Sequence, residues 1–397
     1  MKRYLIPFLF FLLACLASRP ASPTAAADPA SPPQSGTVLC LPGIYPLDPQ
    51  DCLPVGPSEV RTRNAQQGML LPLPPLPAYK PDRSLVSVPF RYAMLKENEP
   101  TPVYKTMEDA QAKANPVDTI AAGKLRFIAY FDSFDTDDNG KPNYFHLTSD
   151  GWVSVDSVAT RISPVPWLLG LTFQHTPLNA FGWIILLNPT AQTKRTPGQE
   201  IDDYTGHLLT EYDRVQIYAA QKVGEEEWFL LGPDEWLEAS LVGRVVPNTD
   251  PPEGVTNGRW IEVNLFEQTL AVYDKRQLVF ATLIATGIEP FWTRPGLFQI
   301  YKRFDSTLMR GAFEADRSDF YYLQEVPWTM YYDEARALHG AYWRTRFGFP
   351  QSHGCVNLAP GDAHWLFNWA QEGDWVYVWD PSGKTPTDPS FFTVGAP

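Results

Sequence analysis

Apolar and polar residues alternate along much of the C-terminal third of the chain. Residues 260–265, which read WIEVNL, are a clear example, and a period of two is typical of a strand with one buried face. Further strands are predicted at residues 269–273, 278–287, 298–302 and 375–379. Residues 359–372 instead carry apolar side chains at helical spacing, with Pro360 near the start and Gly373 after the end, so they predict a helix. The pattern indicates a β-rich domain at residues 256–380 with one or two short helices.

Shorter alternating segments fill residues 84–250 and contain a weak internal repeat. Residues 144–153 (YFHLTSDGWV) align with residues 228–237 (WFLLGPDEWL), each as an aromatic strand, a tight turn and a segment with a Trp. This layout resembles bacterial SH3-like modules, and it predicts two small β-barrels at residues 84–163 and 164–250. The expected fold class is therefore mainly β. Such modules often bind peptidoglycan or peptides, but the alternative, a spacer that positions the next domain, stays open.

The N-terminus has the pattern of an export signal. A short basic start precedes the apolar run at residues 4–13, which is too short to span a bilayer as a helix. We therefore expect residues 1–14 to be a signal peptide and the rest of the chain to lie outside the cytoplasm, in the cell envelope. Cys15 follows a small residue, which resembles a bacterial lipobox and implies a lipid anchor on Cys15. The alternative is an ordinary signal peptide that is cut near Ala17 or Ala21.

Proline dominates the segment that follows, residues 15–83. The chain contains 39 prolines in 397 residues, and proline removes backbone donors and favours extended geometry. The segment is therefore predicted to be a tether without a core. Cys40 and Cys52 enclose a Pro-rich loop within it, where a disulfide is expected in an oxidising compartment. A zinc site would need two further ligands nearby. At the other end of the chain, residues 381–397 are predicted to form a tail.

The charge of the chain argues against one class of partner. The formal net charge at pH 7 is −13, and no cluster of Lys and Arg stands out in the sequence. Nucleic-acid binding depends on neutralising phosphates with such clusters. No nucleic-acid partner is therefore expected, and contact with a membrane is expected through the lipid anchor only.

The stretch HGAYWRTRFGFPQSHGCVNL, residues 339–358, carries the clearest chemistry. It contains Cys355, with His353 two residues before it and His339 sixteen before it. A thiol becomes a nucleophile when it loses its proton to a nearby base or beside a positive charge. The arrangement favours acyl transfer with Cys355 as the nucleophile. A zinc site from these residues and His364 would consume the thiolate, so neither a metal nor a cofactor is expected.

Several motifs occur in an order that resembles the L,D-transpeptidases with a YkuD-type catalytic domain. The motifs are ATG at 285–287, TRPGLF at 293–298, VPWTMYY at 326–332, HG at 339–340 and SHGCVN at 352–357. The ordered series is more specific than any one of its members. One departure is the gap between His339 and Ser352, which is twelve residues long and a little shorter than is usual in the family.

The resemblance implies roles for individual residues. Cys355 would be the nucleophile, His339 the general base and the Gly340 carbonyl its orienting partner. His353 would shape the cleft, and which histidine takes the proton stays open. The amides of Gly354 and Cys355 are candidates for the oxyanion hole, whose donors stabilise the tetrahedral intermediate. The residues expected to contact substrate are Tyr322, Met330, Tyr332, Trp343, Arg344, Ser352 and Asn357.

The resemblance also implies a substrate class. Cys355 would form a thioester with a peptidoglycan stem peptide, and an amine of a second stem would resolve it into a 3–3 cross-link. Water or a protein amine as the acceptor would give a carboxypeptidase or a wall attachment, and carbapenems are expected to acylate the same thiol. An alternative of another class is a wall-binding protein that has lost turnover. A cysteine endopeptidase of the NlpC/P60 type is disfavoured, because in those enzymes the Cys usually precedes the His.

Overall fold

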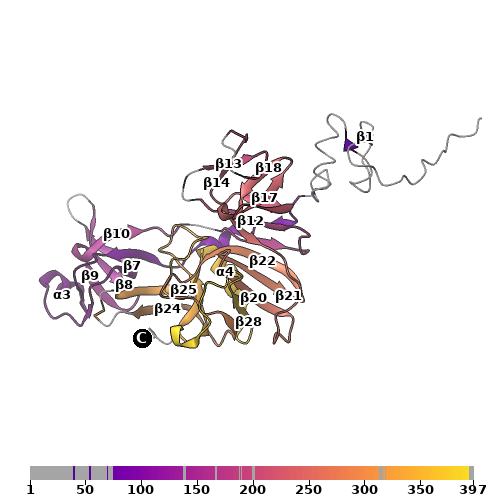
Figure 1. The fold of residues 1–397 in the computed structure, drawn as a ribbon. Coiled ribbons are helices and arrows are strands. Elements are labelled where there is room, and N and C mark those ends of the chain that lie inside the picture. The colour runs from indigo at the N-terminus through magenta and orange to yellow at the C-terminus, as the bar shows by residue number, and fades with distance from the viewer. Residues whose placement is uncertain are drawn as a thin grey trace, which may run out of the picture. The chain divides into compact units, whose positions relative to one another are not determined.

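The computed structural model describes residues 75–392, apart from gaps at 137–139, 166–167, 187, 189, 199–201, 313–315 and 318 (Figure 1). It also describes residue 69 and two short strands that pair in parallel, β1 (Leu39–Cys40) and β2 (Leu53–Pro54). The predicted signal peptide, Cys15, Cys52 and the side chain of Cys40 lie outside the described residues. The lipid anchor and the disulfide therefore stay predictions.

Two units can be distinguished by their internal contacts. Residues 75–231 and 236–397 form one unit, and residues 1–74 with 232–235 form the other. The first unit contains Cys355 and the strands that surround it.

The C-terminal domain is built on a sheet of five strands. These are β20 (Arg259–Asn264), β21 (Thr269–Asp274), β22 (Gln277–Ala285), β23 (Gly296–Gln299) and β28 (Trp375–Trp379). Four of the five fall on predicted segments, while β23 overlaps the predicted segment 298–302 only at residues 298–299. They lie in the order β22-β21-β20-β28-β23. β20 and β28 run parallel, and the other neighbours are antiparallel.

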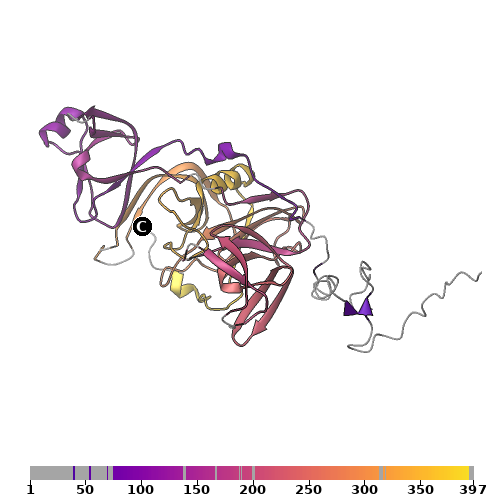
Figure 2. The same cartoon turned by 90° about the horizontal axis from the view of Figure 1, so that it is seen from above.

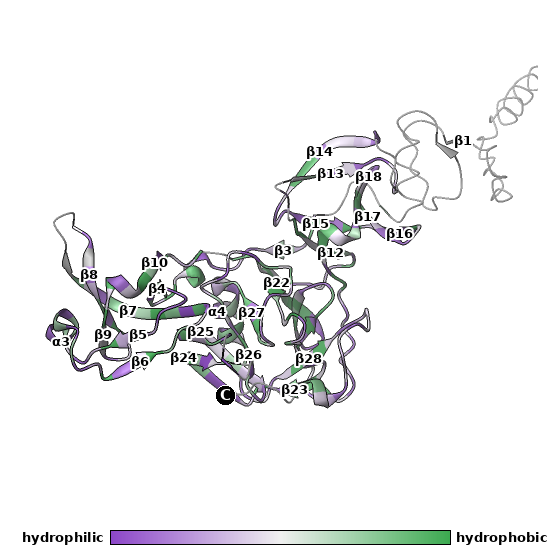
Figure 3. Ribbon diagram, turned by 60° about the vertical axis from the view of Figure 1, so that its left-hand side comes forward, coloured by the Kyte–Doolittle hydropathy of each residue, from purple (hydrophilic) through white to green (hydrophobic). Residues whose placement is uncertain are grey.

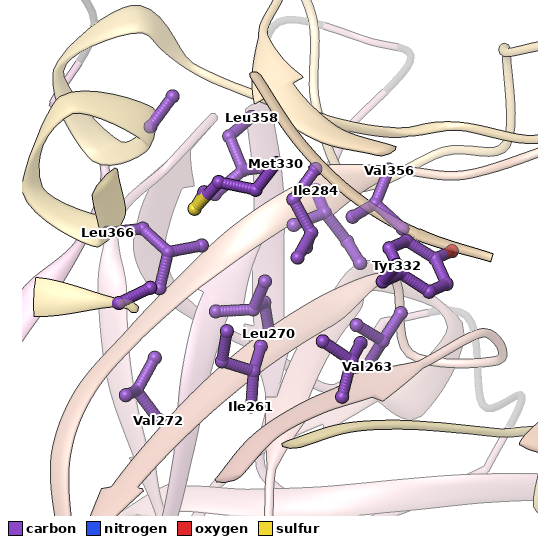
Figure 4. Packing of buried hydrophobic residues seen from close by; sticks show 14 of the residues in the cluster. Ile261, Val263, Leu270, Val272, Ile284, Met330, Tyr332, Val356, Leu358 and Leu366 are labelled. Atoms are coloured by element: carbon purple, nitrogen blue, oxygen red, sulfur yellow. The ribbon is translucent and has the colours of Figure 1, made fainter. Parts of the chain in front are cut away.

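One face of this sheet forms the main core of the domain (Figure 4). The alternation in β20 places Ile261 and Val263 beside Leu270, all with no exposed surface. Helix α4 (Pro360–Trp369) begins with a proline, whose missing N–H would have no partner in the first turn of a helix. Its Leu366 is buried in the same cluster. Full burial of one such side chain contributes roughly 1.5–3 kcal/mol, so this core holds the sheet that carries the site.

Four further strands bring the two halves of the Cys/His motif together. They are β24 (Lys302–Gly311), β25 (Tyr321–Asp333), β26 (Arg336–Gly340) and β27 (Val356–Leu358). β24 and β25 form a long antiparallel hairpin, and β25 continues antiparallel to β26. β26 runs parallel to β27, which joins β22. His339 lies in β26 and Cys355 immediately precedes β27, so the two residues reach neighbouring parallel strands.

Residues 84–163, here called the first β region, share a sheet with this hairpin. Their elements are β4 (Arg91–Leu95), β5 (Thr101–Val103), α3 (Met107–Ala112), β6 (Asp118–Ile120), β7 (Leu125–Thr136), β8 (Pro142–Leu147), β9 (Gly151–Ser154) and β10 (Val158–Ile162). β7 runs parallel to β25, with Leu125 opposite Tyr321 and Phe127 opposite Leu323. Figure 1 shows the purple β7 beside the orange β25, and Figure 2 shows the purple and orange strands of this sheet from above.

Residues 164–250, here called the second β region, form sheets of their own. The three-stranded sheet contains β12 (Ala180–Ile184), β15 (Arg214–Ile217) and β19 (Val242–Val245). The five-stranded sheet contains β13 (Thr190–Lys194), β14 (Tyr204–Thr210), β16 (Ala219–Val223), β17 (Glu226–Gly232) and β18 (Glu235–Glu238). β11 (Leu171–Phe173) is an exception, because it pairs with β22 and with β3 (Ala78–Tyr79).

The internal repeat corresponds to the same order of elements in both regions. In the first, β8 and β9 are followed by the 3-10 helix η2 (Val155–Ser157) and β10; in the second, β17 and β18 are followed by η3 (Ala239–Leu241) and β19. The mainly β fold class is confirmed, whereas the SH3-like assignment of the two regions stays a prediction. Figure 3 shows the hydrophobic residues along β7 and β22. In the part of the chain that the structure describes, no helix has the length and apolarity to cross a membrane.

Candidate active site

A cavity of about 600 Å³ opens beside Cys355. Its wall combines aromatic, aliphatic and charged side chains from β25, β26 and the loop before β27. Of the residues predicted for the site, those that line it are His339, Trp343, Arg344, Ser352, His353, Cys355 and Asn357. A largely apolar cavity with a few convergent polar groups is typical of a ligand site.

The loop that carries Cys355 is fixed by the segments of the ATG and TRPGLF motifs. Ser352 N donates to Thr286 O (2.9 Å), and Thr293 Oγ1 donates to Gly354 O (2.9 Å). Gly354 has φ = 114°, a backbone conformation that only glycine adopts readily. The SHGC sequence thus needs its glycine for the turn that brings Cys355 to the cavity.

The hydroxyl of Ser352 closes this turn from inside. Its Oγ donates to Cys355 O and accepts from Gly354 N at 3.2 Å. Gly354 N is one of the two amides predicted for the oxyanion hole. In this structure its hydrogen bond goes to Ser352, so Ser352 supports the loop from within while also lining the cavity.

Opposing influences act on the thiol of Cys355. Its Sγ lies 3.8 Å from Ala335 O, and the side chain is half-buried. Burial raises the pKa of the thiol, whereas a backbone hydrogen bond from Ala337 and the positive charge of Arg336 lower it. The thiolate therefore has two stabilising partners, both on β26.

His339 is held as a neutral imidazole. The side chain is 2% exposed, and burial lowers its pKa to about 4, with the charge of Arg344 acting in the same direction. Its Nδ1 lies 3.3 Å from Gly340 O, the partner that the resemblance to the L,D-transpeptidases implies. Because a carbonyl can only accept, this contact places the proton on Nδ1 and leaves Nε2 as an acceptor.

Asn357 satisfies Nε2 and links His339 to Arg344. Asn357 lies opposite His339 in the parallel pairing of β26 and β27. With its amide nitrogen turned towards the imidazole, that nitrogen donates to His339 Nε2 at 2.9 Å, and its oxygen accepts from Arg344 Nη2 at 3.0 Å. Arg344 also donates to Gln351 Oε1 (3.1 Å), and burial lowers its pKa to about 10. Both ring nitrogens of His339 are thus engaged, and among the described residues no hydrogen bond joins His339 to Cys355.

His353 lies on the aromatic side of the cavity. Its ring centroid is 4.8 Å from that of Phe291 and 6.2 Å from that of Tyr321. Burial lowers its pKa, so at neutral pH it is an uncharged part of the wall. A role for His353 in shaping the cleft stays a prediction.

The zinc alternative has no geometric support among the described residues. His364 stacks on Trp328 with ring centroids 4.4 Å apart, and its Nδ1 lies 3.1 Å from Leu85 O. Within the described ranges, no group of three or more His, Cys, Asp or Glu side chains is placed to hold a metal ion.

Three residues predicted to contact substrate do not line the cavity. Met330 and Tyr332 are buried in the main core (Figure 4), and Tyr322 is buried in a core cluster of the first β region. Their neighbours on β25 line the cavity instead, namely Tyr321, Leu323 and Tyr331. The three predicted residues lie on β25, the strand that lines the cavity, but their side chains lie on its other face. As substrate contacts, the three stay predictions without a contact in this structure.

The cavity also contains residues that the sequence did not suggest. Arg336 lies three residues before His339 on the same strand, and Leu125 comes from the first β region. Ser390, Phe391 and Phe392 come from the segment predicted as a tail, where η4 (Pro389–Phe392) forms. A charged residue in the otherwise apolar strand RALHG was the one sequence signal available for Arg336.

Comparison with protein families gives one match. Residues 258–378 match the YkuD family, the L,D-transpeptidase catalytic domain. The matched segment runs from the start of β20 to the end of β28 and contains both His339 and Cys355. The YkuD match leaves both β regions outside it. The comparison with curated proteins returned no match.

Solved L,D-transpeptidases are similar over about a third of this chain. One from Stackebrandtia nassauensis is 25% identical, with 32% of this chain and 57% of that chain covered and a TM-score of 0.26. L,D-transpeptidase 1 of Mycobacterium tuberculosis is 21% identical, with 30% and 60% covered and a TM-score of 0.26. The catalytic domain of an E. faecium L,D-transpeptidase, solved acylated by ertapenem, is 25% identical, with 32% and 100% covered and a TM-score of 0.28.

Proposed function

We propose that this protein is an exported L,D-transpeptidase that acts on peptidoglycan stem peptides through a thioester on Cys355. The observation that carries the proposal is the pairing of β26 with β27 in a segment that matches the YkuD catalytic domain. This pairing brings a half-buried thiol and a neutral imidazole to one cavity of about 600 Å³. That combination suits nucleophilic acyl transfer.

In the first half of the proposed reaction, the Cys355 sulfur attacks the carbonyl carbon of a stem peptide. A carbon–sulfur bond forms, the carbon–nitrogen bond to the terminal D-residue breaks, and the proton lost by the thiol ends on the departing amine. His339 is proposed to carry this proton, because an imidazole that is neutral at pH 7 can accept one. In the second half, an amine of another stem attacks the thioester, which gives a 3–3 link and restores the thiol.

The cellular place of the reaction is also a proposal. The basic and apolar start of the chain supports export, and Cys15 supports a lipid anchor that leads into the Pro-rich tether. A protein that carries this tether would reach the wall from the membrane surface. Cleavage and acylation can be read directly from the mass of the N-terminal peptide of the mature protein.

A carbapenem provides the first test. Incubation of the purified protein should add one drug mass, on the peptide that contains Cys355, and the variant Cys355→Ala should remain unmodified. A second test uses wall fragments: the wild type should produce 3–3-linked muropeptides, and Cys355→Ala should produce none. An unmodified protein mass after long exposure to the carbapenem, together with an unchanged muropeptide profile, would refute the proposed transpeptidase activity. Retention of both proteins on sacculi would then favour the wall-binding alternative.

A further inference from the structure

Arg336 is the cationic residue next to the nucleophile. It begins β26 and lines the cavity, and its side chain is 14% exposed. A Cβ atom built on Gly354 would lie 3.4 Å from Arg336 Nε and 3.8 Å from its Cδ. The guanidinium stem therefore packs against the backbone that immediately precedes Cys355.

Two acceptors fix the far end of this guanidinium. Arg336 Nη1 donates to Asp333 Oδ2 (3.0 Å), and Nη2 donates to the carbonyl of Phe392 (3.1 Å). The guanidinium carbon lies 5.3 Å from the centroid of the Phe392 ring. Its Nε is buried, and within the described part of the chain it has no hydrogen-bond partner. Nε, the donor of Arg336 nearest to the Cys355 loop, is thus the one without an acceptor among the described residues.

The charge of Arg336 is only partly neutralised. Its counterion Asp333 also accepts from Arg294 Nη1 at 3.1 Å, so one buried carboxylate serves two guanidinium groups. The Arg294–Asp333–Arg336 cluster therefore keeps one net positive charge. A cation within about 4–6 Å stabilises an anion and lowers its pKa by roughly 1–3 units.

The other titratable groups around the thiol supply no comparable charge. Tyr321, Tyr331 and Tyr332 on β25 are kept neutral, since burial raises the pKa of each well above its ordinary value. His339 and His353 are kept neutral because burial lowers their pKa. Three further charged groups line the cavity. Arg310 and Glu334 are exposed, and Arg344 is held by Gln351 and Asn357.

From this geometry we infer that Arg336 is a positioning residue that keeps a positive charge beside the Cys355 sulfur and so favours the thiolate. In the free protein the step is the acid dissociation of the thiol, whose proton passes to water, and it does not require a hydrogen bond from His339. In the proposed reaction with a stem peptide, His339 delivers the balancing proton to the departing amine. The inference deepens the proposed function, since the thiolate is the form that would attack the stem peptide. The effect of Arg336 on the pKa of the thiol can be tested without any wall substrate.

The test is the pH dependence of alkylation of the full chain by iodoacetamide, followed by mass spectrometry of the peptide that contains Cys355. Arg336→Met should raise the midpoint of the alkylation profile by about one pH unit and slow alkylation at pH 7 about tenfold. Arg336→Lys should restore part of the shift, because it returns the charge without the fork of donors. Arg346→Met, which removes a guanidinium that pairs with Glu211 instead, is the matched control and should leave the midpoint unchanged.

Two further variants keep the inference testable if Arg336→Met does not fold. Arg294→Met removes the second guanidinium without touching the thiol, so Asp333 then neutralises Arg336 fully and the midpoint should rise by a smaller amount. His339→Gln should leave the midpoint where it is in the wild type. A midpoint that moves with His339→Gln and not with the Arg294 or Arg336 variants would overturn the inference. If the midpoint behaves as expected but neither a carbapenem adduct nor 3–3-linked muropeptides form, the inference stands and the proposed function fails.

Discussion

The first and second β regions contain the same order of elements, yet they are attached to the YkuD segment differently. The first continues the sheet through β7 and β25, and Tyr92 stacks on Tyr342 with ring centroids 3.5 Å apart. The second pairs only its short strand β11 with β22 and is otherwise attached through side chains. Arg244 Nη2 lies 2.8 Å from Glu267 Oε1, and Tyr212 Oη accepts from Phe347 N at 3.0 Å.

The difference determines what each region contributes to the site. The first region supplies Leu125 to the cavity wall, and its Phe127 lies on Trp343, which in turn faces His339 at 5.6 Å between ring centroids. No described residue of the second region lines the cavity. It braces the outer side of the short stretch between His339 and Ser352, around Phe347. One copy of the repeat is therefore part of the site, and the other supports a loop behind it.

The largest expected effect comes from removing one buried aromatic side chain in each of the two regions. Tyr92→Ala in the first region and Phe229→Ala in the second both empty fully buried positions, so each should lower the free energy of unfolding by about 3–5 kcal/mol. Only Tyr92→Ala should also change the alkylation rate of Cys355 in the folded protein, because Tyr92 supports Tyr342 and donates to Glu325 O at 2.8 Å. Denaturant titration and thiol labelling check the pair. Equal labelling effects from both would contradict the comparison.

The next effect concerns the titration of His339. Its folded pKa of about 4 lies below its ordinary value of 6.5, so between these values the unfolded chain binds more protons. The free energy of unfolding should therefore fall as the pH drops from 6.5 to 4, by about 3 kcal/mol in total. His339→Gln should lack this part of the pH dependence in urea titrations made across that range.

The same titration distinguishes the two regions. Phe127→Ala removes the ring that covers Trp343, and the water admitted there should raise the pKa of His339 towards 6.5, as followed by NMR of the labelled imidazole. Tyr212→Phe, in the second region, should leave this pKa unchanged. An unshifted pKa in Phe127→Ala would show that the first region does not keep the imidazole dry.

A smaller effect is expected at the ion pair that holds the second region. Glu267 is 7% exposed and receives both the backbone N–H and the guanidinium of Arg244. Arg244→Met leaves the carboxylate without its cation, and because the Arg244 side chain is 23% exposed, we expect a loss of about 2 kcal/mol rather than the larger cost of a fully buried pair. Alkylation of Cys355 should keep its wild-type rate. A slowed rate would mean that the second region reaches the thiol after all.

Local patterns in the sequence were enough to predict β20, β21, β22 and β28, the repeat and the presence of a Cys/His pair, but not β24, β26 or β27. Alternation is visible within a few residues, and the SHGC motif requires a glycine for the positive φ of Gly354. The pairing of β7 with β25 joins residues almost 200 positions apart, and nothing local specifies its register.

The choice of side chains on β25 was not predictable for a related reason. Tyr321, Leu323 and Tyr331 line the cavity, whereas Tyr322, Met330 and Tyr332 lie in the cores, so the period of two is kept between the two ends of the strand. Both faces carry aromatic and apolar side chains, and the alternation alone does not say which face turns towards the cavity. Arg336 was missed because its importance depends on Gly354 and Asp333, which approach it only in the fold.

The smallest expected effect tests how the second region braces the loop. Tyr212→Phe removes only the hydroxyl that accepts from Phe347 N, while the ring stays in its apolar surroundings. Loss of one such hydrogen bond should lower the free energy of unfolding by about 1 kcal/mol, and amide exchange at Phe347 should become faster in a local opening that leaves β26 and β27 protected. If the exchange of β26 also accelerates, the loop and strands β26 and β27 open as one unit. In that case the hydrogen bond from Phe347 N to Tyr212 would stabilise the strands of the site as well as the loop. Both copies of the repeat would then support the site, and they would differ only in how each is attached to the YkuD segment.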